Sequence, residues 1–455
     1  MPSGPALLSV DDLFGHLNQQ MRLRRTERST ILSGPNGSGK TTLLKILRAM
    51  VALDFPALGR LPFQSAQLTY HNGLTLSAWR TTPESAQVKF DIAQLRRETE
   101  SATLLLVRAY DKKGQQLPGS LEVPIEPDPF DDIELPVYIE RVGPTQWMDV
   151  RDGELMSSQA LLRRYSPGAS RLRPPAEHPL PPSWLARFEP AAMPTLIATA
   201  RLDVGARQID PPASWLRVRR QSNPQAASQI RQYVERISSL VATARSESLL
   251  RSQRADRQFP TRALDKQRLA SPEASLREGY ERIVLLLHDL HANGLAEESI
   301  GLIFPEGRKS QVERRILTLF LDDWEDKLQP LVPVHERLQL LREIVGEKMK
   351  GKSLVIGEDG SLSFTAQTGE TIPVEVLSSG EQHLLALFTM LLFEAAPGSL
   401  VLIDEPEISL HAAWQHEFLN DLDKVAELIN LRFVLATHSQ GIINGRWDLV
   451  EELGL

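Results

Sequence analysis

The chain has 455 residues, of which 42% are hydrophobic and 24% charged, a balance typical of folded globular proteins and not of disordered or fibrous ones. Its formal net charge of −7 argues against a general binder of polyanions. The absence of cysteine excludes disulfides, cysteine zinc sites and thiol nucleophiles, and it fits a reducing compartment. The N-terminus has no signal-peptide pattern, and no apolar run approaches the ~20 residues that span a bilayer, so we expect a cytoplasmic protein without membrane contact.

The first recognisable unit is a strand, a glycine-rich loop and a helix. Residues 29–33 are β-branched and apolar, and residues 41–51 carry Leu and Ile at helical spacing. Between them lies a P-loop pattern without a mismatch, which includes Gly34, Pro35, Asn36, Gly37, Ser38, Gly39, Lys40, Thr41 and the adjoining Thr42. Such glycines let backbone N–H groups surround phosphate at the N-terminus of a helix. We predict an ATP site in which Lys40 reaches the β- and γ-phosphates and Thr41 binds Mg²⁺; a chance glycine-rich turn is the alternative.

A β-rich stretch follows the P-loop helix. Asn72-Gly73 between residues 67–70 and 74–79 predicts a hairpin, and residues 103–110 predict a further strand. Residues 119–155 contain ten acidic and two basic side chains, which indicates a solvated face or a docking patch. The proline-rich residues 167–182 indicate a semi-rigid linker.

From residue 225 to about 350 the pattern turns helical. Apolar residues step by three and four in residues 230–244 and 276–290, the latter capped by residues 271–273, and a third helix is expected over 310–327. Residues 245–268, with an expected turn at 258–262, hold seven basic and three acidic side chains. This segment could contact nucleic acid or an acidic partner, or be an ordinary solvated turn. The predicted domains are therefore 1–224, 225–350 and 351–455.

Two apolar runs near the C-terminus, residues 399–403 and 432–436, are typical of central strands in a parallel sheet. Asp404 and Glu405 follow the first run, and the sequence predicts that Asp404 holds Mg²⁺ while Glu405 acts as the general base. Capping of the next helix is the alternative for this pair. His438 follows the second run, where it can reach a γ-phosphate, although a lone histidine is usually structural.

A further small-residue segment, which consists of Ser378, Ser379, Gly380 and Glu381, precedes the apolar residues 384–392. Serine followed three residues later by glutamate is typical of a helix cap. A helix N-terminus without bulky side chains is also a good phosphate site. Both interpretations stay open at this point.

Taken in order, the P-loop, residues 377–381, the Asp404-Glu405 pair, Ser409-Leu410-His411 and His438 resemble an ABC-type ATPase head. The 339 residues between Lys40 and Ser379 resemble the large insertion of the SMC, RecF and OLD-like branch (AAA_15/AAA_21-like). With residues 377–386, 258–262 and 436–449, the chain looks most like the stand-alone ATPase of the PARIS anti-phage defence system and more distantly like the Septu ATPase. This implies an α/β fold: a split ABC-type P-loop NTPase head with an antiparallel β-subdomain and an inserted helical or short coiled-coil arm.

The resemblance also implies partners and roles. Two or more copies would sandwich ATP between their heads, with the signature residues Ser378, Ser379, Gly380 and Glu381 acting in trans and Ser409, Leu410 and His411 forming the communicating D-loop. Lys40, Glu405 and His438 would be catalytic, and ATP and Mg²⁺ the cofactors. The Q-loop glutamine is missing from its expected place, because residues 194–202 offer Thr199 and Arg201 instead.

Since only seventeen residues follow His438, we expect any effector, by resemblance a Toprim-type nuclease, to be a separate protein that a phage-encoded trigger releases. The alternative is a RecF/SMC-like DNA repair or recombination ATPase that binds DNA directly. The ATPase subunit of a transporter is disfavoured by the length of the insertion.

Overall fold

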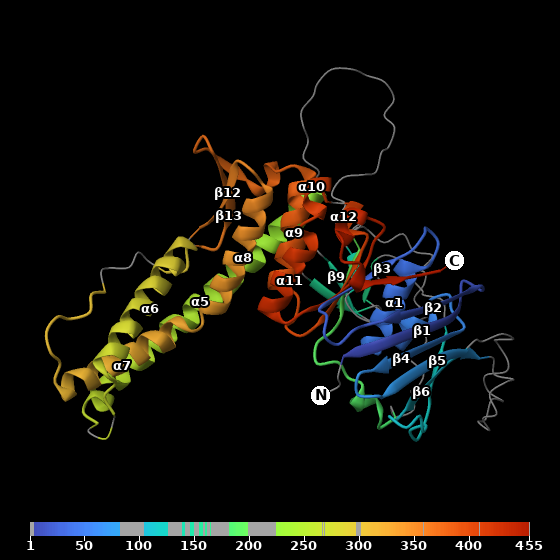
Figure 1. Cartoon of the computed structure of the whole chain (residues 1–455), viewed down its shortest axis with the longest axis horizontal. Helices are drawn as coiled ribbons and strands as arrows, with labels where there is room; N and C mark the ends of the chain where they lie inside the picture. Colours follow the sequence, from blue (N-terminus) through green and yellow to red (C-terminus); the bar gives the residue numbers. More distant parts are fainter. Residues whose placement is uncertain are drawn as a thin grey trace, which may run out of the picture. The chain divides into compact units, whose positions relative to one another are not determined.

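The computed structural model describes most of the chain, in two compact units. The described residues are 4–81, 104–125, 139–141, 146–149, 154–157, 160–161, 164, 182–198, 224–265, 267, 269–296, 302–357, 359–408 and 410–454. Unit 1 combines residues 1–201 with residues 395–455, and unit 2 comprises residues 202–394. Both ends of the chain therefore build one unit, and the second unit is inserted between them in sequence (Figure 1).

A parallel sheet forms the first layer of unit 1. Its strand order is β11 (Thr195–Ala198), β15 (Leu400–Asp404), β16 (Arg432–Ala436), β3 (Ser29–Ser33) and β17 (Val450–Glu452). Each neighbouring pair is parallel, so the C-terminal ends of the strands meet at one edge. The buried runs of β15 and β16 are uninterrupted, as expected for strands covered on both faces. The helices that accompany these strands are α10 (Ala412–Gln415), α11 (Phe418–Ile429) and α12 (Gln440–Ile443).

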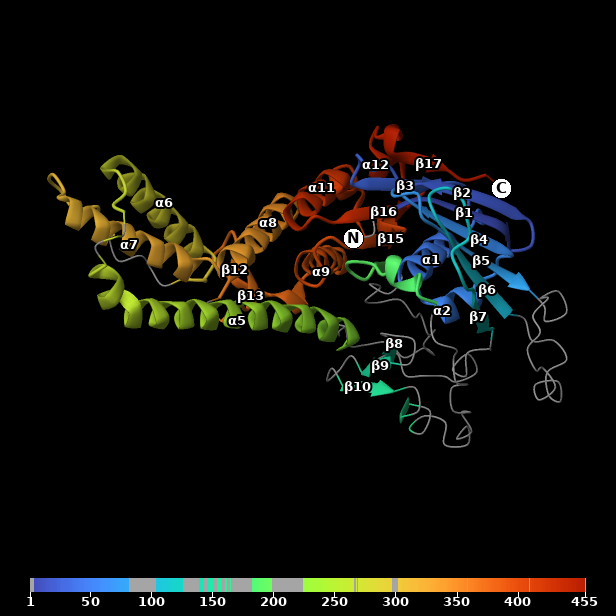
Figure 2. The ribbon, with the colours of Figure 1, turned by 90° about the horizontal axis from the view of Figure 1, so that it is seen from below.

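The second sheet of unit 1 is antiparallel. It has the order β2 (Leu17–Arg22), β1 (Pro5–Leu13), β4 (Ser65–Tyr70), β5 (Thr75–Thr81), β6 (Leu104–Tyr110) and β7 (Leu121–Pro124). Figure 2 shows these strands beside α1 (Lys40–Val51) and the short α2 (Phe55–Gly59). The hairpin predicted at Asn72-Gly73 and the strand predicted at 103–110 are confirmed as β4–β5 and β6. A separate small sheet has the order β10 (Glu154–Ser157), β9 (Gln146–Asp149) and β8 (Ile139–Arg141).

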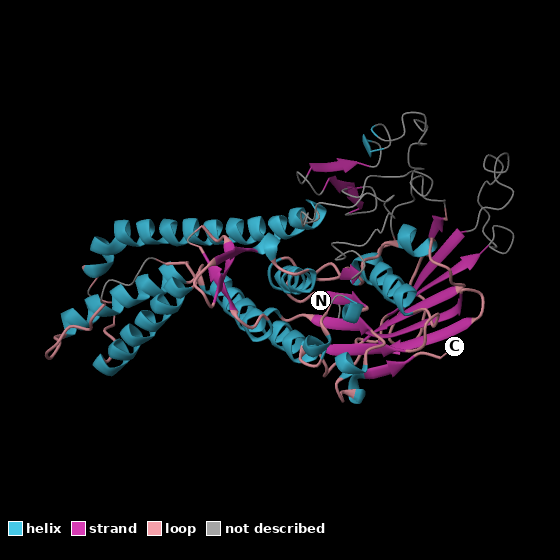
Figure 3. Ribbon diagram, turned by 90° about the horizontal axis from the view of Figure 1, so that it is seen from above, coloured by secondary structure: helices cyan, strands magenta, loops and turns pink. Residues whose placement is uncertain are grey.

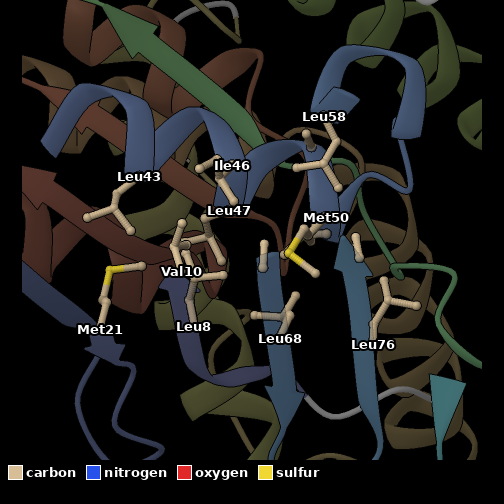
Figure 4. Close-up of a cluster of buried hydrophobic side chains, with 14 of the residues drawn as sticks. Leu8, Val10, Met21, Leu43, Ile46, Leu47, Met50, Leu58, Leu68 and Leu76 are labelled. Carbon is tan, nitrogen blue, oxygen red and sulfur yellow. The ribbon is translucent and has the colours of Figure 1, made fainter. Parts of the chain in front are cut away.

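Helix α1 lies between the two sheets of unit 1 and supplies much of the core. It contacts β1 and β4 on one side and β11, β15 and β16 on the other. Figure 4 shows its apolar side chains Leu43, Ile46, Leu47 and Met50 directed at strand residues such as Leu68. Each fully buried leucine or isoleucine contributes about 1.5–3 kcal/mol, so this packing fixes the helix whose N-terminus follows the P-loop.

Unit 2 is mainly helical, as Figure 3 shows. Its helices are α5 (Pro224–Ala263), α6 (Glu273–Ala292), α7 (Gln311–Leu328), α8 (Val332–Lys348) and α9 (Ser379–Phe393). Helix α7 contacts both α5 and α6, where the rings of Tyr280 and Phe320 stack with centroids 5.6 Å apart. A small antiparallel sheet with the order β12 (Lys352–Ile356), β13 (Leu362–Ala366) and β14 (Thr371–Pro373) precedes α9.

Two local expectations for the helical region were wrong. Residues 258–262 do not form a turn, because α5 continues to Ala263 with Pro260 inside its last turns. A proline so near the end removes only one backbone hydrogen bond, and ion pairs from Arg251 and Arg262 to α7 hold this end in place. Helix α6 has Pro272 as its N-cap and no side-chain cap bond among the described residues, so Ser271 does not cap it.

The predicted fold class is confirmed: an α/β, split ABC-type P-loop NTPase head with an antiparallel β-subdomain and an inserted helical arm. The division into units differs from the predicted domain boundaries in that residues 351–394 group with the helices of unit 2. Within the parts of the chain that the structure describes, none of the helices combines the length and apolar character that crossing a bilayer requires. Most of the acidic residues 119–155 and of the proline-rich residues 167–182 lie outside the described residues.

Candidate functional site: the P-loop pocket of unit 1

The P-loop connects β3 to α1 through two left-handed glycines. Gly37 and Gly39 have φ values of +87° and +86°, which glycine adopts without a steric penalty. A Cβ on Gly37 would meet open space, whereas a Cβ on Gly39 would lie 2.5 Å from Cδ2 of Leu13. The loop therefore turns tightly into α1, and backbone amides lie at the positive end of that helix.

Lys40 is the first residue of α1, and its ammonium group is held inside the loop. Nζ donates to the carbonyl oxygens of Gly34 at 2.8 Å and Pro35 at 3.1 Å, and it lies 2.6 Å from Nε2 of His438. Burial lowers the pKa of Lys40, and the neighbouring carboxylates oppose this effect. Those carboxylates belong to Glu405, Asp404 and Glu407. The ammonium group of Lys40 thus lies within the electrostatic reach of three carboxylates.

The carboxylates lie at the end of β15 and in the residues that come directly after it. The parallel register places Asp404 beside Ala436, the last residue of β16, so the segments after both strands start from the same edge of the sheet. The backbone N–H of Glu405 donates to the carbonyl of Ala436 at 2.8 Å. Glu405 has φ +50°, a left-handed conformation that an L-residue adopts at a penalty of about 1–2 kcal/mol. Such strain is characteristic of functional sites.

Asp404 and Thr41 form the polar pair that the sequence predicted for Mg²⁺. Burial raises the pKa of Asp404, while a hydrogen bond with the Thr41 side chain and the charges of Lys45 and Lys40 act in the opposite direction. A hydroxyl beside a partly buried carboxylate is an all-oxygen donor set that suits Mg²⁺. Among the described residues no group of three or more acidic or histidine side chains could hold a metal ion alone. Mg²⁺ held by one or two protein ligands and by substrate phosphates fits this arrangement.

His438 follows β16 and faces Lys40 and Glu405. Its Nε2 lies 4.0 Å from Oε1 of Glu405, and the two side chains are 34% and 36% exposed. The 2.6 Å contact between Nζ of Lys40 and Nε2 of His438 places the imidazole against the amino group, with donor and acceptor roles set by the histidine tautomer. The backbone N–H of His438 donates to Oε1 of Glu407 at 2.7 Å. The imidazole is therefore held from both its ring and its main chain.

These groups surround one pocket of about 190 Å³. It is lined by Phe14, Asn36, Gly37, Gly39, Lys40, Thr41, Thr42, Glu405 and His438. Pockets that enclose a whole drug-sized ligand have volumes of about 300–1,000 Å³, so this one matches the phosphate end of a nucleotide better than the whole molecule. The structure thus brings together eight residues that the sequence predicted.

Phe14 is the lining residue that sequence reasoning missed. It belongs to the turn between β1 and β2, has φ +57° and is 45% exposed. The only signal in the sequence is an aromatic residue just before Gly15 in a polar turn. That pattern is too common in sequences to predict that Phe14 lies beside a loop more than twenty residues further on.

The P-loop is held in place by contacts outside the pocket. Ser38 is fully buried, and its Oγ has no hydrogen-bond partner among the described residues. The loop carbonyl of Ser38 accepts from Nε2 of the buried Gln19, which also donates to Gly454. This anchor fixes the loop beside the pocket, which Ser38 itself does not line.

The remaining predicted residues lie elsewhere. Ser378 is the N-cap of α9, where its side chain and that of Glu381 form a capping box, and Lys352 pairs with Glu381 at 2.7 Å. Ser379 is exposed, and Gly380 is half-buried. Leu410 is buried, and His411 caps the short α10, whereas Ser409, Thr199 and Arg201 lie outside the described residues. Of the strand predicted at 194–202, β11 confirms Thr195–Ala198, and residues 199–202 lie outside the described residues.

Comparison with known proteins gives one family match. No curated protein sequence matches this chain. Two solved structures illustrate the level of structural similarity. The first is an SMC head domain with an extended coiled coil, bound to the C-terminal domain of ScpA, from Pyrococcus furiosus. It has 13% sequence identity and a TM-score of 0.34, and the match covers 97% of this chain and 91% of the other. The SMC head domain from Thermotoga maritima has 10% identity, a TM-score of 0.32, and coverage of 98% and 94%.

The sequence matches the family model AAA_21, described as "AAA domain, putative AbiEii toxin, Type IV TA system", over residues 214–444. The matched range takes in the signature segment, the Asp404-Glu405 pair and His438, and it spans just over half of the 455 residues. The chain therefore belongs to the AAA_21 family.

Proposed function

We propose that this protein binds ATP with Mg²⁺ and hydrolyses it. The observation that carries the proposal is the contact of Lys40 with His438 beside the Asp404-Glu405 pair, around a pocket lined by the P-loop. These four residues come from sequence positions nearly 400 residues apart, and they meet only because β3, β15 and β16 share one sheet edge. Such an assembly of cation, carboxylates and loop amides suits phosphoryl transfer to water.

Each side chain has a defined part in this reaction. Lys40 exchanges its loop carbonyls for the β- and γ-phosphates, and Thr41 with Asp404 holds Mg²⁺. When bound, Mg²⁺ offsets the negative charge of the phosphates. Glu405 accepts a proton from the attacking water, and His438 donates a hydrogen bond toward the γ-phosphate.

Isothermal titration and a phosphate-release assay test this proposal with three variants. Glu405→Gln is expected to keep ATP affinity within about threefold and to lose at least about a hundredfold in kcat, the contribution typical of a general base. Lys40→Ala is expected to lose ATP binding. Glu427→Ala, a substitution on the exposed face of α11, is the matched control and should behave like the parent. A parent protein that neither binds nor hydrolyses ATP would refute the proposal, and normal turnover by Glu405→Gln would refute the base assignment.

The biological role that we propose is regulation of a bacterial anti-phage, abortive-infection system of the PARIS type. The family description, with its toxin and toxin–antitoxin terms, supports a defence context. In this proposal ATP-sandwiched heads assemble a homo-oligomer, with Ser379 and Gly380 of one copy acting on the ATP of another. The assembly restrains a separate effector, a Toprim-type nuclease, until a phage protein triggers release.

Co-expression with a Toprim-type nuclease encoded beside this gene tests the role. We expect the parent and Glu405→Gln to co-purify with the nuclease at a fixed stoichiometry, and Lys40→Ala to lose both the oligomer and the nuclease. Phage infection of cells that carry the parent pair should then release nuclease activity. Unaltered phage growth in those cells, with both proteins expressed, would count against the defence role but not against ATP hydrolysis.

The alternative, direct DNA binding by a repair or recombination ATPase, has less support. It relied on the basic residues of α5, but Arg251 pairs with Asp326, and Arg262 pairs with Asp323 of the neighbouring α7. Arg254 and Arg257 stay exposed on this helix. Binding of duplex DNA that weakens steeply with salt and disappears on neutralising those two arginines would favour the alternative.

A further inference from the structure

A carboxylate that the proposed reaction does not use directly lies behind His438. Glu407 is in the single 3₁₀ turn η4 (Pro406–Ile408) that follows the Asp404-Glu405 pair. Its Oε1 accepts the backbone N–H of His438 at 2.7 Å, a length typical of charge-assisted hydrogen bonds. Its Oε2 is buried and has no hydrogen-bond partner among the described residues. One carboxylate oxygen is thus committed to the His438 main chain, and the other makes no competing bond there.

The position of His438 explains why its main chain needs such a partner. β16 ends at Ala436, and the short α12 begins only at Gln440 with Ser439 as its N-cap. His438 therefore lies between the strand and the helix, where neither element supplies an acceptor for its N–H. Without Glu407 this exposed N–H would bond to water, which does not tie the segment to the residues after β15. The Glu407 carboxylate supplies the missing acceptor.

A second link ties the same two segments together. Nε2 of Gln415 donates to the carbonyls of Glu407 at 3.4 Å and Leu410 at 3.2 Å, and Oε1 of Gln415 accepts from Oγ of Ser439 at 2.6 Å. The residues after β15 and the residues after β16 are therefore linked at His438 itself and, through Gln415, at the next residue, Ser439. The imidazole of His438 contacts Lys40 from this segment. The position of the ring relative to Lys40 therefore depends on how firmly the segment is held.

We propose that Glu407 is a positioning residue, whose carboxylate fixes the main chain of His438 and so holds the imidazole against Lys40 and the pocket. This inference rests on the proposed ATPase function, because His438 is the group that it serves. Glu407 acts through its hydrogen bond and not through acid–base chemistry. A displacement of about 1 Å in a reacting or orienting group can lower a rate by about a hundredfold, so a single lost anchor is sufficient to matter.

Steady-state ATP hydrolysis in a double-mutant cycle separates this role from a merely structural one. Glu407→Ala is expected to lower kcat by about ten- to a hundredfold, with ATP affinity within about threefold of the parent. Glu407→Gln keeps an oxygen acceptor for the His438 N–H and should recover most of that loss. In a His438→Ala background, Glu407→Ala should have almost no further effect on kcat, because no imidazole is left to position. The control Glu427→Ala should match the parent.

Three outcomes would overturn the inference: additive losses in the cycle, a Glu407→Gln variant as slow as Glu407→Ala, or a Glu407→Ala variant with parental kcat. Hydrogen exchange provides a reading that does not require turnover. The amide of His438, followed in peptides that cover residues 436–440, should exchange about tenfold faster in Glu407→Ala than in Glu407→Gln. If the parent itself fails to hydrolyse ATP, the proposed function fails, whereas equal exchange in the two variants refutes the anchor alone.

Discussion

Alanine at Gly39 would test how tightly the P-loop is built against the β1–β2 turn. The residue has φ +86°, and its Cβ would lie 2.5 Å from Cδ2 of Leu13, whose side chain is fully buried. A left-handed backbone disfavours an L-residue by about 1–2 kcal/mol, and overpacking against a buried side chain adds about 1–3 kcal/mol. We therefore expect Gly39→Ala to lower the free energy of unfolding by about 2–5 kcal/mol.

Gly37→Ala is the matched control for this substitution. Gly37 has nearly the same φ, +87°, but its Cβ would meet no atom within 4 Å. Only the conformational penalty of about 1–2 kcal/mol should remain. Urea unfolding followed by circular dichroism measures both losses under the same conditions. Equal losses in the two variants would refute the steric reasoning, and the absence of any loss in either would refute the assigned backbone conformation.

Three further predictions concern the start of α9. Ser378→Ala should lower the free energy of unfolding by about 0.5–2 kcal/mol by removing the cap, whereas Ser379→Ala, one residue on and exposed, should leave it unchanged in the same urea titration. Burial raises the pKa of Glu381, but hydrogen bonds from Lys352 and Ser378 outweigh it and leave the pKa below its usual 4.5. The stability that Glu381 contributes is therefore present above about pH 4.5 and lost as the pH falls through the lowered pKa. The difference in free energy of unfolding between the parent and Lys352→Met should therefore narrow on acidification. A difference that stays constant with pH would contradict this. Ser379→Arg should block ATP hydrolysis but leave ATP binding to one subunit intact, and surviving hydrolysis would argue against action in trans.

The local parts of the head could be predicted from sequence because their chemistry is local. The strand at 29–33 and the P-loop that follows it were predicted residue by residue, since Gly37 and Gly39 take positive φ values that glycine adopts without a steric penalty. The end of β15 was equally clear, because an apolar run that stops at two carboxylates is typical of a buried strand that ends at a polar edge of its sheet. Phe14 could not be found in this way, since its place in the pocket depends on tertiary packing beside Gly39.

The extent of α5 could not be predicted for a different reason. Pro260 and the density of arginines favoured a turn, and local propensity was the only information available. In the folded chain, α7 supplies Asp323 and Asp326 as partners for Arg262 and Arg251. Packing against α7, together with these ion pairs, thus accompanies a helix that continues through a proline near its end. The pairing of two helices is not visible in the periodicity of either one.

Of the two interpretations of residues 378–381, the helix cap is confirmed, and the phosphate site stays a prediction. Ser378 Oγ donates to Oε2 of Glu381, and Glu381 also accepts from Lys352, so both side chains are engaged in holding the first turn of α9. Ser379 is exposed and Gly380 has no side chain. The hydroxyl of one and the backbone of the other are therefore what an anion would meet at the positive end of this helix. In this arrangement the cap fixes the first turn, and the proposed action in trans would fall to Ser379 and Gly380, the two residues between the capping partners.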